Sequence, residues 1–260
     1  PVIQGGSMEM GDWSRRATVL AIFNPKGGVG KTTIATNLAS ALQLHRSQKV
    51  LLIDADTVTG HVTTSLGLEQ VRTVADSWRD QEEGGPVETL VELAAPHPSG
   101  LTVVSLTSSP LNTEILDPAR VADAIATARP QIDFIVVDLH PSYSSLNMAI
   151  FERADRILVP VTPDVPALRA AVQLRDVAID HGVEIARIRV LFDQRIVRVA
   201  RLDVAVVEKV ALRLHEHRLV LLDELLRLVP AAHLQGLGGL LEVRRAARPR
   251  RVHRGVLVLL

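Results

Sequence analysis

The chain has 260 residues, of which 47% are hydrophobic and 22% charged, a balance typical of a folded globular protein rather than a disordered one. It contains no cysteine, which excludes disulfide bonds and thiolate metal sites, and its formal net charge is zero. No stretch reaches the roughly 18 consecutive apolar residues that a membrane span needs. Residues 1–16 lack the layout of a secretory signal, and we expect them to form a flexible extension of a cytoplasmic protein.

Short apolar runs alternate with helical patterns along most of the chain. Residues 117–130 are a clear helical pattern, with Asp117 able to cap the helix and Pro118 in its first turn. Weaker helical segments cover residues 74–80 and 86–93, and a polar turn follows residue 106. The apolar runs predict buried strands at 18–23, 49–54, 101–106, 134–138, 156–161 and 187–192, with a further helix at 32–45.

Continuous apolar strands that alternate with helices predict an α/β fold, with a mostly parallel sheet and helices on both faces. Ligands of such sheets bind beyond the carboxyl ends of the strands. A glycine-rich loop follows the first strand, and aspartates end the strands at 49–54 and 134–138. We therefore expect these three segments to meet at one edge of the sheet.

The glycine-rich loop reads FNPKGGVGKTT over residues 23–33, with Pro25 where the common phosphate-loop pattern has glycine. Backbone N–H groups around glycines can surround an anion, and the helix that follows favours negative charge at its start. Lys31 can reach the β- and γ-phosphates of a nucleotide, and the Thr32 hydroxyl can bind Mg²⁺. The predicted nucleotide-binding residues are Lys26, Gly27, Gly28, Val29, Gly30, Lys31, Thr32 and Thr33. The alternative is a basic loop that only links a strand to a helix.

The stretch KGGVGKTT resembles the deviant Walker A motif of the ParA/MinD family of dimeric ATPases, which have the P-loop NTPase fold. The resemblance implies that Lys26 is a signature lysine, which contacts phosphate across the interface of an ATP-bound homodimer. It extends over residues 17–192, which we predict to be the ATPase domain.

Two acidic segments extend this resemblance. LLIDADT (51–57) is similar to the second acidic motif of the family, which implies that Asp56 positions the attacking water and that Asp54 supports the magnesium shell. DFIVVDLHP (133–141) is similar to a Walker B strand, which implies that Asp138 holds Mg²⁺ through water. Lys26, Lys31 and Asp56 are thus the predicted catalytic residues, and Thr32, Asp54 and Asp138 the predicted metal ligands. We interpret His140 as a loop histidine that can alter the switch rather than as a catalyst.

The segments FNPKGG, HPSGLTVVSL and PDVPALRAA are most like the CpaE/TadZ branch, which is associated with pilus assembly. Members of that branch usually carry an additional N-terminal receiver-like domain. The family usually has an asparagine–arginine pair near the adenine, where this chain has DQR at residues 193–195.

Residues 193–260 follow no clear strand–turn–helix pattern and form a separate C-terminal segment in our prediction. Residues 243–255 carry six arginines and no acid, which is typical of a DNA or anionic-membrane contact or, equally, of a solvated tail.

The leading hypothesis is an ATP- and Mg²⁺-dependent dimerisation switch that positions or assembles a cellular structure, with a pilus or secretion system as its partner and recruitment to a pole or membrane. The alternatives are a DNA-partitioning or septum-positioning ATPase, and a nucleotide-binding localisation scaffold with little hydrolysis. A metabolic P-loop kinase fits the double-lysine loop less well.

Overall fold

The computed structural model describes residues 17–44, 48–68, 71–162 and 164–192. This part of the chain contains one seven-stranded sheet with the strand order β3-β4-β2-β5-β1-β6-β7. Neighbouring strands are parallel except β3, which is antiparallel to β4. The strands are β1 (Thr18–Ile22), β2 (Val50–Ala55), β3 (Ala95–Pro96), β4 (Thr102–Ser105), β5 (Phe134–Leu139), β6 (Arg156–Val161) and β7 (Ile188–Phe192).

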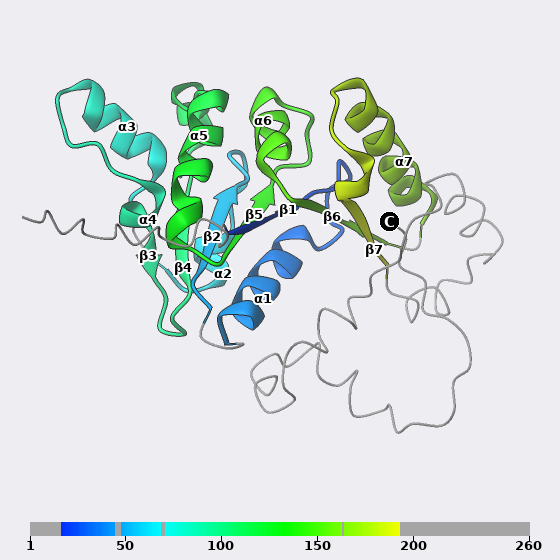
Figure 1. Cartoon of the computed structure of the whole chain (residues 1–260), viewed down its shortest axis with the longest axis horizontal. Helices are drawn as coiled ribbons and strands as arrows, with labels where there is room; N and C mark the ends of the chain where they lie inside the picture. The colour runs from blue at the N-terminus through cyan, green and yellow to red at the C-terminus, as the bar shows by residue number, and fades with distance from the viewer. Residues whose placement is uncertain (1–16, 45–47, 69–70, 163, 193–260) are drawn as a thin grey trace, which may run out of the picture.

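Helices cover both faces of the sheet, as predicted (Figure 1). Helices α1 and α2 lie on one face, and α3, α4, α5, α6 and α7 lie on the other. The helices are α1 (Lys31–Leu44), α2 (Val62–Ser65), α3 (Val74–Glu82), α4 (Leu90–Leu93), α5 (Pro118–Ala128), α6 (Ser145–Arg153) and α7 (Val165–Asp180). Three short 3₁₀ helices complete the secondary structure of the described residues, at η1 (Pro110–Ile115), η2 (Arg129–Gln131) and η3 (Ile185–Arg187).

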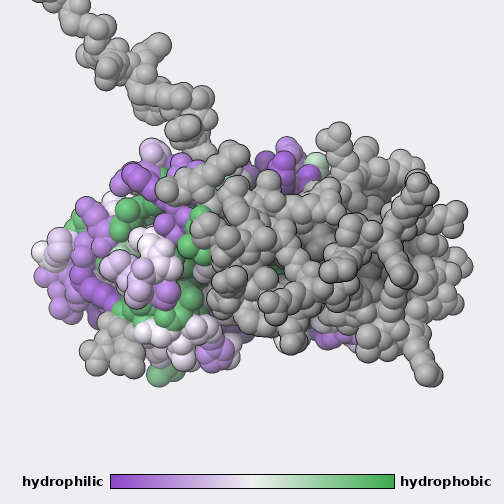
Figure 2. Space-filling view, turned by 90° about the horizontal axis from the view of Figure 1, so that it is seen from below, coloured by the Kyte–Doolittle hydropathy of each residue, from purple (hydrophilic) through white to green (hydrophobic). Residues whose placement is uncertain are grey.

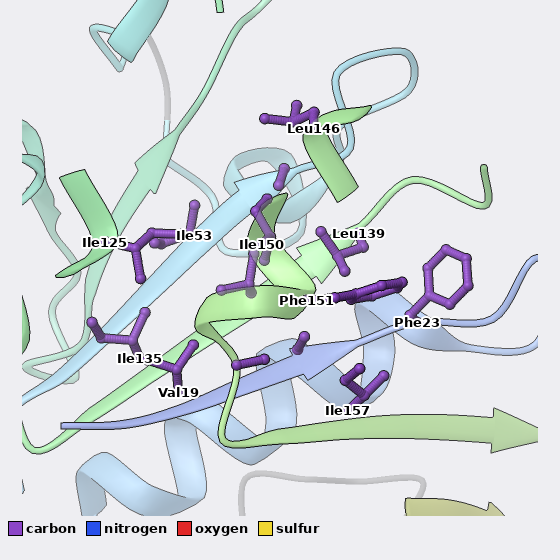
Figure 3. Packing of buried hydrophobic residues seen from close by; sticks show 14 of the residues in the cluster. Val19, Phe23, Ile53, Ile125, Ile135, Leu139, Leu146, Ile150, Phe151 and Ile157 are labelled. Atoms are coloured by element: carbon purple, nitrogen blue, oxygen red, sulfur yellow. The ribbon is translucent and has the colours of Figure 1, made fainter. Parts of the chain in front are cut away.

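Two hydrophobic layers hold these helices on the sheet, because successive residues of a strand point to opposite faces. In β1, for example, Val19 and Ala21 pack under the larger helical layer, whereas Leu20 and Ile22 pack on the side of α1. Figure 3 shows the larger layer, in which the ring of Phe151 from α6 meets Phe23 edge-on at a centroid distance of 5.0 Å. Both rings are fully buried, so this pair fixes α6 above the strand that leads into the glycine loop.

On the opposite face, α1 packs on the sheet through small side chains. Ala35 and Ala39 are fully buried against the strands, and they let the helix axis approach the sheet closely. Figure 2 views the molecule from this side, where the described surface mixes hydrophilic and hydrophobic residues. The close packing of α1 matters for function, because the first residues of the helix, Lys31 and Thr32, lie near Asp138 toward the end of β5.

The predicted strands and the helices at 32–45, 74–80 and 117–130 are confirmed, with small differences at their ends. Asp117 caps α5 as predicted, accepting a hydrogen bond of 2.7 Å from the backbone N–H of Arg120. The segment 86–93 forms only the single turn of α4, because its Thr89 side chain caps a helix that begins at Leu90.

The sequence prediction missed β3, the short helix α2 and the 3₁₀ helix η1. Strand β3 is two residues long and ends in Pro96, which suits an edge strand because proline has no N–H to donate to a ladder. The predicted segments 1–16 and 193–260, with the DQR sequence and the arginine-rich stretch, lie outside the described residues. Within the described part of the chain, no helix has both the length and the apolar character that a bilayer crossing needs.

Candidate functional site

The glycine-rich loop joins the end of β1 to the start of α1, at the carboxyl edge of the parallel strands (Figure 1). Gly28 and Gly30 adopt positive φ angles of 74° and 83°, a conformation that side chains disfavour. A Cβ built on either glycine, or on Gly27, meets no atom within 4 Å, so the space beside the loop is open. Backbone N–H groups in such a loop can bind an anion at the positive end of α1.

Lys31 begins α1 and is the buried lysine of the site, with 8% of its surface exposed. Burial lowers the pKa of its ammonium group, and the nearby charges of Asp138 and Asp56 partly offset this effect. Within the described part of the chain its ammonium group forms no hydrogen bond or ion pair. Lys31 is therefore a buried cation that faces two acids and remains available for a further anionic group.

Two aspartates are brought together by the pairing of β2 with β5. The register places Asp54 directly opposite Asp138, and both side chains point to the face that carries α1. Both carboxyl groups are buried, with 5% and 1% of their residue surface exposed. The sequence prediction that the acids of these strands meet at one edge of the sheet is thus confirmed.

Asp138 is a buried carboxyl group whose two oxygens have no hydrogen-bond partner among the described residues. Burial raises the pKa of Asp138 to about 7; the nearby Thr32 hydroxyl and Lys31 oppose this rise, whereas the charges of Asp54 and Asp56 add to it. Buried polar atoms normally have partners, so a carboxyl group left without one needs an explanation. A cation with bound water at this position would supply both the charge and the missing hydrogen bonds.

Asp54 has a different environment, because backbone groups already occupy its oxygens. One oxygen accepts the N–H of Asp56 at 3.1 Å and the other accepts the N–H of Val62 at 3.1 Å. Burial raises the pKa of Asp54 to about 6 against these hydrogen bonds. A Cβ on Gly60 would lie 2.9 Å from Asp54 Oδ2, so only glycine fits the chain that folds over this carboxyl group. Asp54 thus organises the loop that carries Asp56.

Asp56 stays a carboxylate in spite of its partial burial. Burial alone would raise the pKa of Asp56, but hydrogen bonds from the Thr59 backbone, the His140 side chain and the Val58 backbone lower it below the usual value. The Thr59 N–H and the Thr59 hydroxyl lie 2.9 and 3.0 Å from its two oxygens. His140 Nδ1 lies 2.8 Å from Asp56 Oδ1, a contact that the sequence prediction did not foresee.

Lys26 lies at the other end of the loop, and its side chain contacts residues that follow β6 rather than Asp54 or Asp138. Its Nζ donates to Asp164 Oδ2 at 2.7 Å and to Thr162 Oγ1 at 3.3 Å, with about a third of each charged side chain exposed. Asp164 also caps α7 by accepting the Ala167 N–H at 2.9 Å. Lys26 is therefore paired within its own chain in this structure.

Asn24 fixes the start of the loop and was not singled out from the sequence. Its side chain is fully buried, donates to the Pro160 carbonyl at 2.7 Å and accepts the Lys26 N–H at 2.7 Å. The loop is thus attached to β6 by one amide. Its position inside the FNPKGG stretch is a signal that could have identified it, since a polar residue directly after an apolar strand is common in turns.

A cavity of about 610 Å³ opens beside the aspartates, between the ends of β2 and β4. Asp54 and Asp56 lie on its wall, together with the hydroxyl groups of Thr57, Thr59 and Ser105. Within the described residues, no group of three or more histidine or acidic side chains is arranged to hold a metal without other ligands. A magnesium ion here would need phosphate oxygens and water to complete its shell, which is how Mg²⁺ is usually bound with nucleotides.

Comparison with known proteins agrees with this geometry. Residues 17–179 match a sequence family described as an AAA domain. The chain is 29% identical over 171 residues to the chromosome partitioning protein ParA of Myxococcus xanthus, an alignment that covers 62% of this chain and 58% of that protein. It is 30% identical over 179 residues to the septum site-determining protein MinD of Thermotoga maritima, covering 68% of this chain and 64% of that one. The matched part therefore spans about three fifths of these curated relatives.

Solved structures show the same fold. A ParA family ATPase from Chlorobium tepidum superimposes with a TM-score of 0.62 at 22% identity, covering 85% of this chain and 96% of that one. MinD from Pyrococcus horikoshii, solved as a complex with Mg-ADP, has a TM-score of 0.62 at 18% identity and covers 85% of this chain and 89% of its own. From its matched domain, its fold and its relatives, the chain belongs to the ParA/MinD family of P-loop ATPases.

Proposed function

We propose that the chain is an ATP-hydrolysing dimerisation switch that positions or assembles a cellular structure. The observation that carries the proposal is Asp138, a buried carboxyl group without a hydrogen-bond partner among the described residues, next to the buried Lys31 and the open glycine loop. A site with a buried acid, a buried cation that forms no ion pair among the described residues, and a loop of backbone N–H groups is complementary to a magnesium-bound polyphosphate.

In this proposal the nucleotide lies along residues 26–33. Backbone N–H groups of Gly27, Gly28, Val29 and Gly30 bind its phosphate oxygens, and the N-terminus of α1 adds its positive end. Lys31 neutralises charge on the β- and γ-phosphates. Thr33, in the first turn of α1, is the last residue of the proposed nucleotide contact. Because the loop is already open and its glycines already have positive φ, binding needs little rearrangement at this end.

The residues around Asp138 fit a magnesium ion. Thr32 would bind it through its hydroxyl group, and Asp138 would accept hydrogen bonds from its bound water. When bound, the ion would neutralise charge that develops on the phosphates. Asp54 supports this shell indirectly, by holding the loop that begins at Asp56.

Asp56 is the proposed residue that orients the attacking water. Its lowered pKa keeps it a carboxylate that can accept a hydrogen bond from water. Oδ1 accepts three hydrogen bonds and Oδ2 accepts one, so Oδ2 retains a lone pair for a water molecule. Positioning of this kind is the main contribution that a protein makes to phosphoryl transfer.

Lys26 provides the proposed switch. In the ATP state it would leave Asp164 and contact the phosphate of a second copy of the chain, so that two chains share two nucleotides. Hydrolysis would remove that contact and return the chain to the paired state seen here.

The test is to measure phosphate release and molar mass with ATP, ADP and no nucleotide. We expect a dimer only with ATP, and we expect Lys26→Ala to remain monomeric while still binding nucleotide. Lys49→Ala is the matched control, because Lys49 is exposed and lies at the opposite edge of the sheet. A wild-type chain that stays monomeric and releases no phosphate would overturn the proposal.

The cellular structure served by the switch is part of the same proposal. The CpaE/TadZ-like segments favour a pilus or secretion partner and recruitment from the cytoplasm to a pole or membrane. The relatives named for chromosome partitioning and septum-site determination favour a partitioning or septum-positioning role. ATP-dependent DNA binding that weakens steeply with salt would select partitioning, and it would assign the arginine-rich stretch 243–255 to phosphates.

A localisation scaffold that binds nucleotide without hydrolysing it is the second candidate. The well-anchored carboxylate of Asp56 favours hydrolysis over this alternative. If wild-type turnover is measurable and Asp56→Ala removes it, the scaffold is excluded. Nucleotide binding with no turnover in either protein would select it.

A further inference from the structure

His140 occupies a position that neither the motif resemblance nor the proposed function uses. The sheet register pairs Asp54 with Asp138 and Ala55 with Leu139, so the next pair beyond the end of the ladder is Asp56 and His140. Their side chains continue the pairing, with His140 Nδ1 at 2.8 Å from Asp56 Oδ1. About a quarter of the His140 side chain and an eighth of the Asp56 side chain are exposed, so the contact is largely shielded from water.

The other hydrogen bonds to Asp56 come from its own loop. Val58 and Thr59 are two and three residues away, and they move with Asp56 if the loop shifts. His140 is 84 residues away and follows β5, the strand that carries Asp138. Among the described residues it forms the only hydrogen bond that ties the Asp56 side chain to a different strand, and this strand carries the proposed magnesium ligand.

His140 is itself held in place by a buried amide. The side chain of Asn147, which is fully buried in α6, donates to the His140 carbonyl at 2.8 Å and to the Ser142 carbonyl at 2.6 Å. The Ser142 N–H also donates to the His140 carbonyl at 2.8 Å. A residue that positions another must first be fixed, and the backbone of His140 meets that requirement.

The hydrogen in the contact belongs to the imidazole. Asp56 is ionised and can only accept, so Nδ1 must carry the hydrogen and donate it to Oδ1. With Oδ1 occupied in this way, Oδ2 is the oxygen that remains available. His140, together with the N–H groups of Val58 and Thr59, thereby leaves Oδ2 as the oxygen of Asp56 that can meet a water molecule.

We propose that His140 is a positioning residue for ATP hydrolysis, which sets the Asp56 carboxylate relative to Asp138 through its Nδ1–H. The proposal rests on the proposed function, since it requires that Asp56 orient the attacking water. The proposed function assigns His140 no contact with the nucleotide, so its loss should lower the rate of the chemical step and leave nucleotide affinity almost unchanged.

Three variants of His140 test the geometry. Nδ1 of histidine and Nδ2 of asparagine are both bonded to Cγ, whereas Nε2 of glutamine is one atom further out. We therefore expect His140→Leu to lower kcat by roughly 10- to 100-fold with KM for ATP within about twofold, as is usual when an orienting partner is lost. His140→Asn should recover most of kcat, and His140→Gln should not. A His140→Leu variant with wild-type kcat, or equal recovery by both amides, would overturn the proposal.

A spectroscopic measurement keeps the test independent of turnover, and its decisive observation is made on the wild-type chain. In the ¹⁵N-labelled wild-type chain, a long-range ¹H–¹⁵N correlation spectrum reports which imidazole nitrogen carries hydrogen, and the His140 signals are assigned by their absence in His140→Asn. We expect hydrogen on Nδ1 in the wild type and a changed pattern in Asp56→Ala. An Nδ1 without hydrogen in the wild type contradicts the inference.

The controls separate this inference from the proposed function. His97→Leu is the matched histidine variant, because His97 is a half-buried loop residue whose ring contacts Ser99, whose backbone bonds to Gly100 and Leu101, and which lies before β4 at the opposite edge of the sheet. If the wild type does not hydrolyse ATP, the proposed function fails. If the wild type and His97→Leu hydrolyse ATP equally and His140→Leu matches them, the inference about His140 fails while the proposed function stands.

Discussion

The two lysines of the glycine loop lie in opposite situations, although only five positions separate them. Lys31 is buried, faces the aspartates at the ends of β2 and β5, and forms no ion pair among the described residues. Lys26 is about one third exposed and already has a partner, Asp164, at the start of α7. Lys31 can bind a phosphate directly, whereas Lys26 must give up its contact with Asp164 before it can bind another group.

This difference separates binding from switching. A buried charge without an ion-pair partner, such as that of Lys31, is stabilised when a ligand of opposite charge binds beside it. A half-exposed ion pair is worth little and is easily exchanged, which suits a contact that must form and break in each cycle. The predictions below test each half of the comparison, beginning with the change that we expect to have the largest effect.

Lys31→Ala should have the largest effect on turnover. Without its charge, the phosphates lose their buried cation, and we expect ATP hydrolysis to fall by on the order of 10²–10³-fold. Phosphate release under saturating ATP measures this loss, and Lys49→Ala should behave as wild type. A Lys31→Ala variant that keeps more than a tenth of the activity would mean that Lys31 and Lys26 do not differ as proposed.

Asp138→Asn should change how stability depends on pH. Burial raises the pKa of Asp138 to about 7 in the nucleotide-free folded chain, whereas the group in the unfolded chain ionises at about pH 4. The wild-type chain therefore has its full stability below about pH 4 and loses part of it as the pH rises through about 7. The variant lacks this ionisation. We expect its unfolding free energy, relative to wild type, to increase by roughly 2–4 kcal/mol between pH 4 and pH 8.

Urea unfolding without nucleotide and with a chelator measures this change. Parallel curves for the two proteins across that range would show that Asp138 has a solvated or paired carboxyl group. The same Asp138→Asn variant should lose Mg²⁺-dependent hydrolysis of ATP. Near pH 8 the substitution therefore favours stability and removes activity.

Asp164→Asn should strengthen the switch while leaving the fold almost unchanged. Asparagine is as good an N-cap as aspartate, so α7 keeps its hydrogen bond to Ala167, but the ion pair with Lys26 is lost. If that pair competes with dimerisation, the variant should dimerise at an ATP concentration several-fold lower than wild type needs. Molar mass measured across an ATP titration tests this, and weaker dimerisation would show that Asp164 assists the ATP state instead.

The ion pair itself should contribute the smallest effect. Partial burial would raise the pKa of Asp164, but hydrogen bonds from Lys26, Thr162 and Ala167 lower it, so its contribution is present above about pH 4 and is lost as the pH falls through the lowered value. Because both charged side chains are about one third exposed, we expect less than about 1 kcal/mol, reduced further by salt. Comparing wild type with Asp164→Asn at pH 6 and pH 3 measures it. A larger loss of unfolding free energy would show that the Lys26–Asp164 pair behaves as a buried ion pair.

Much of the fold could be predicted because its signals are local. The strands are short runs of aliphatic residues, the helices have their own periodicity and caps, and the glycine spacing identifies a phosphate loop without reference to the rest of the chain. Lys31, Thr32 and the aspartates at the strand ends follow from these patterns. The short β3 did not, because two residues ending in Pro96 carry no periodicity.

The sequence by itself thus determined most of the chemical groups of the candidate site, though not Asn24, and the edge of the sheet at which they gather. The tertiary structure decided which of them touch. The contact between His140 and Asp56 spans 84 residues and depends on the register of β2 against β5, while the pair of Lys26 with Asp164 spans 138 residues and depends on β6 lying beside β1. Strand order and register are properties of the whole sheet, so no local pattern contains them.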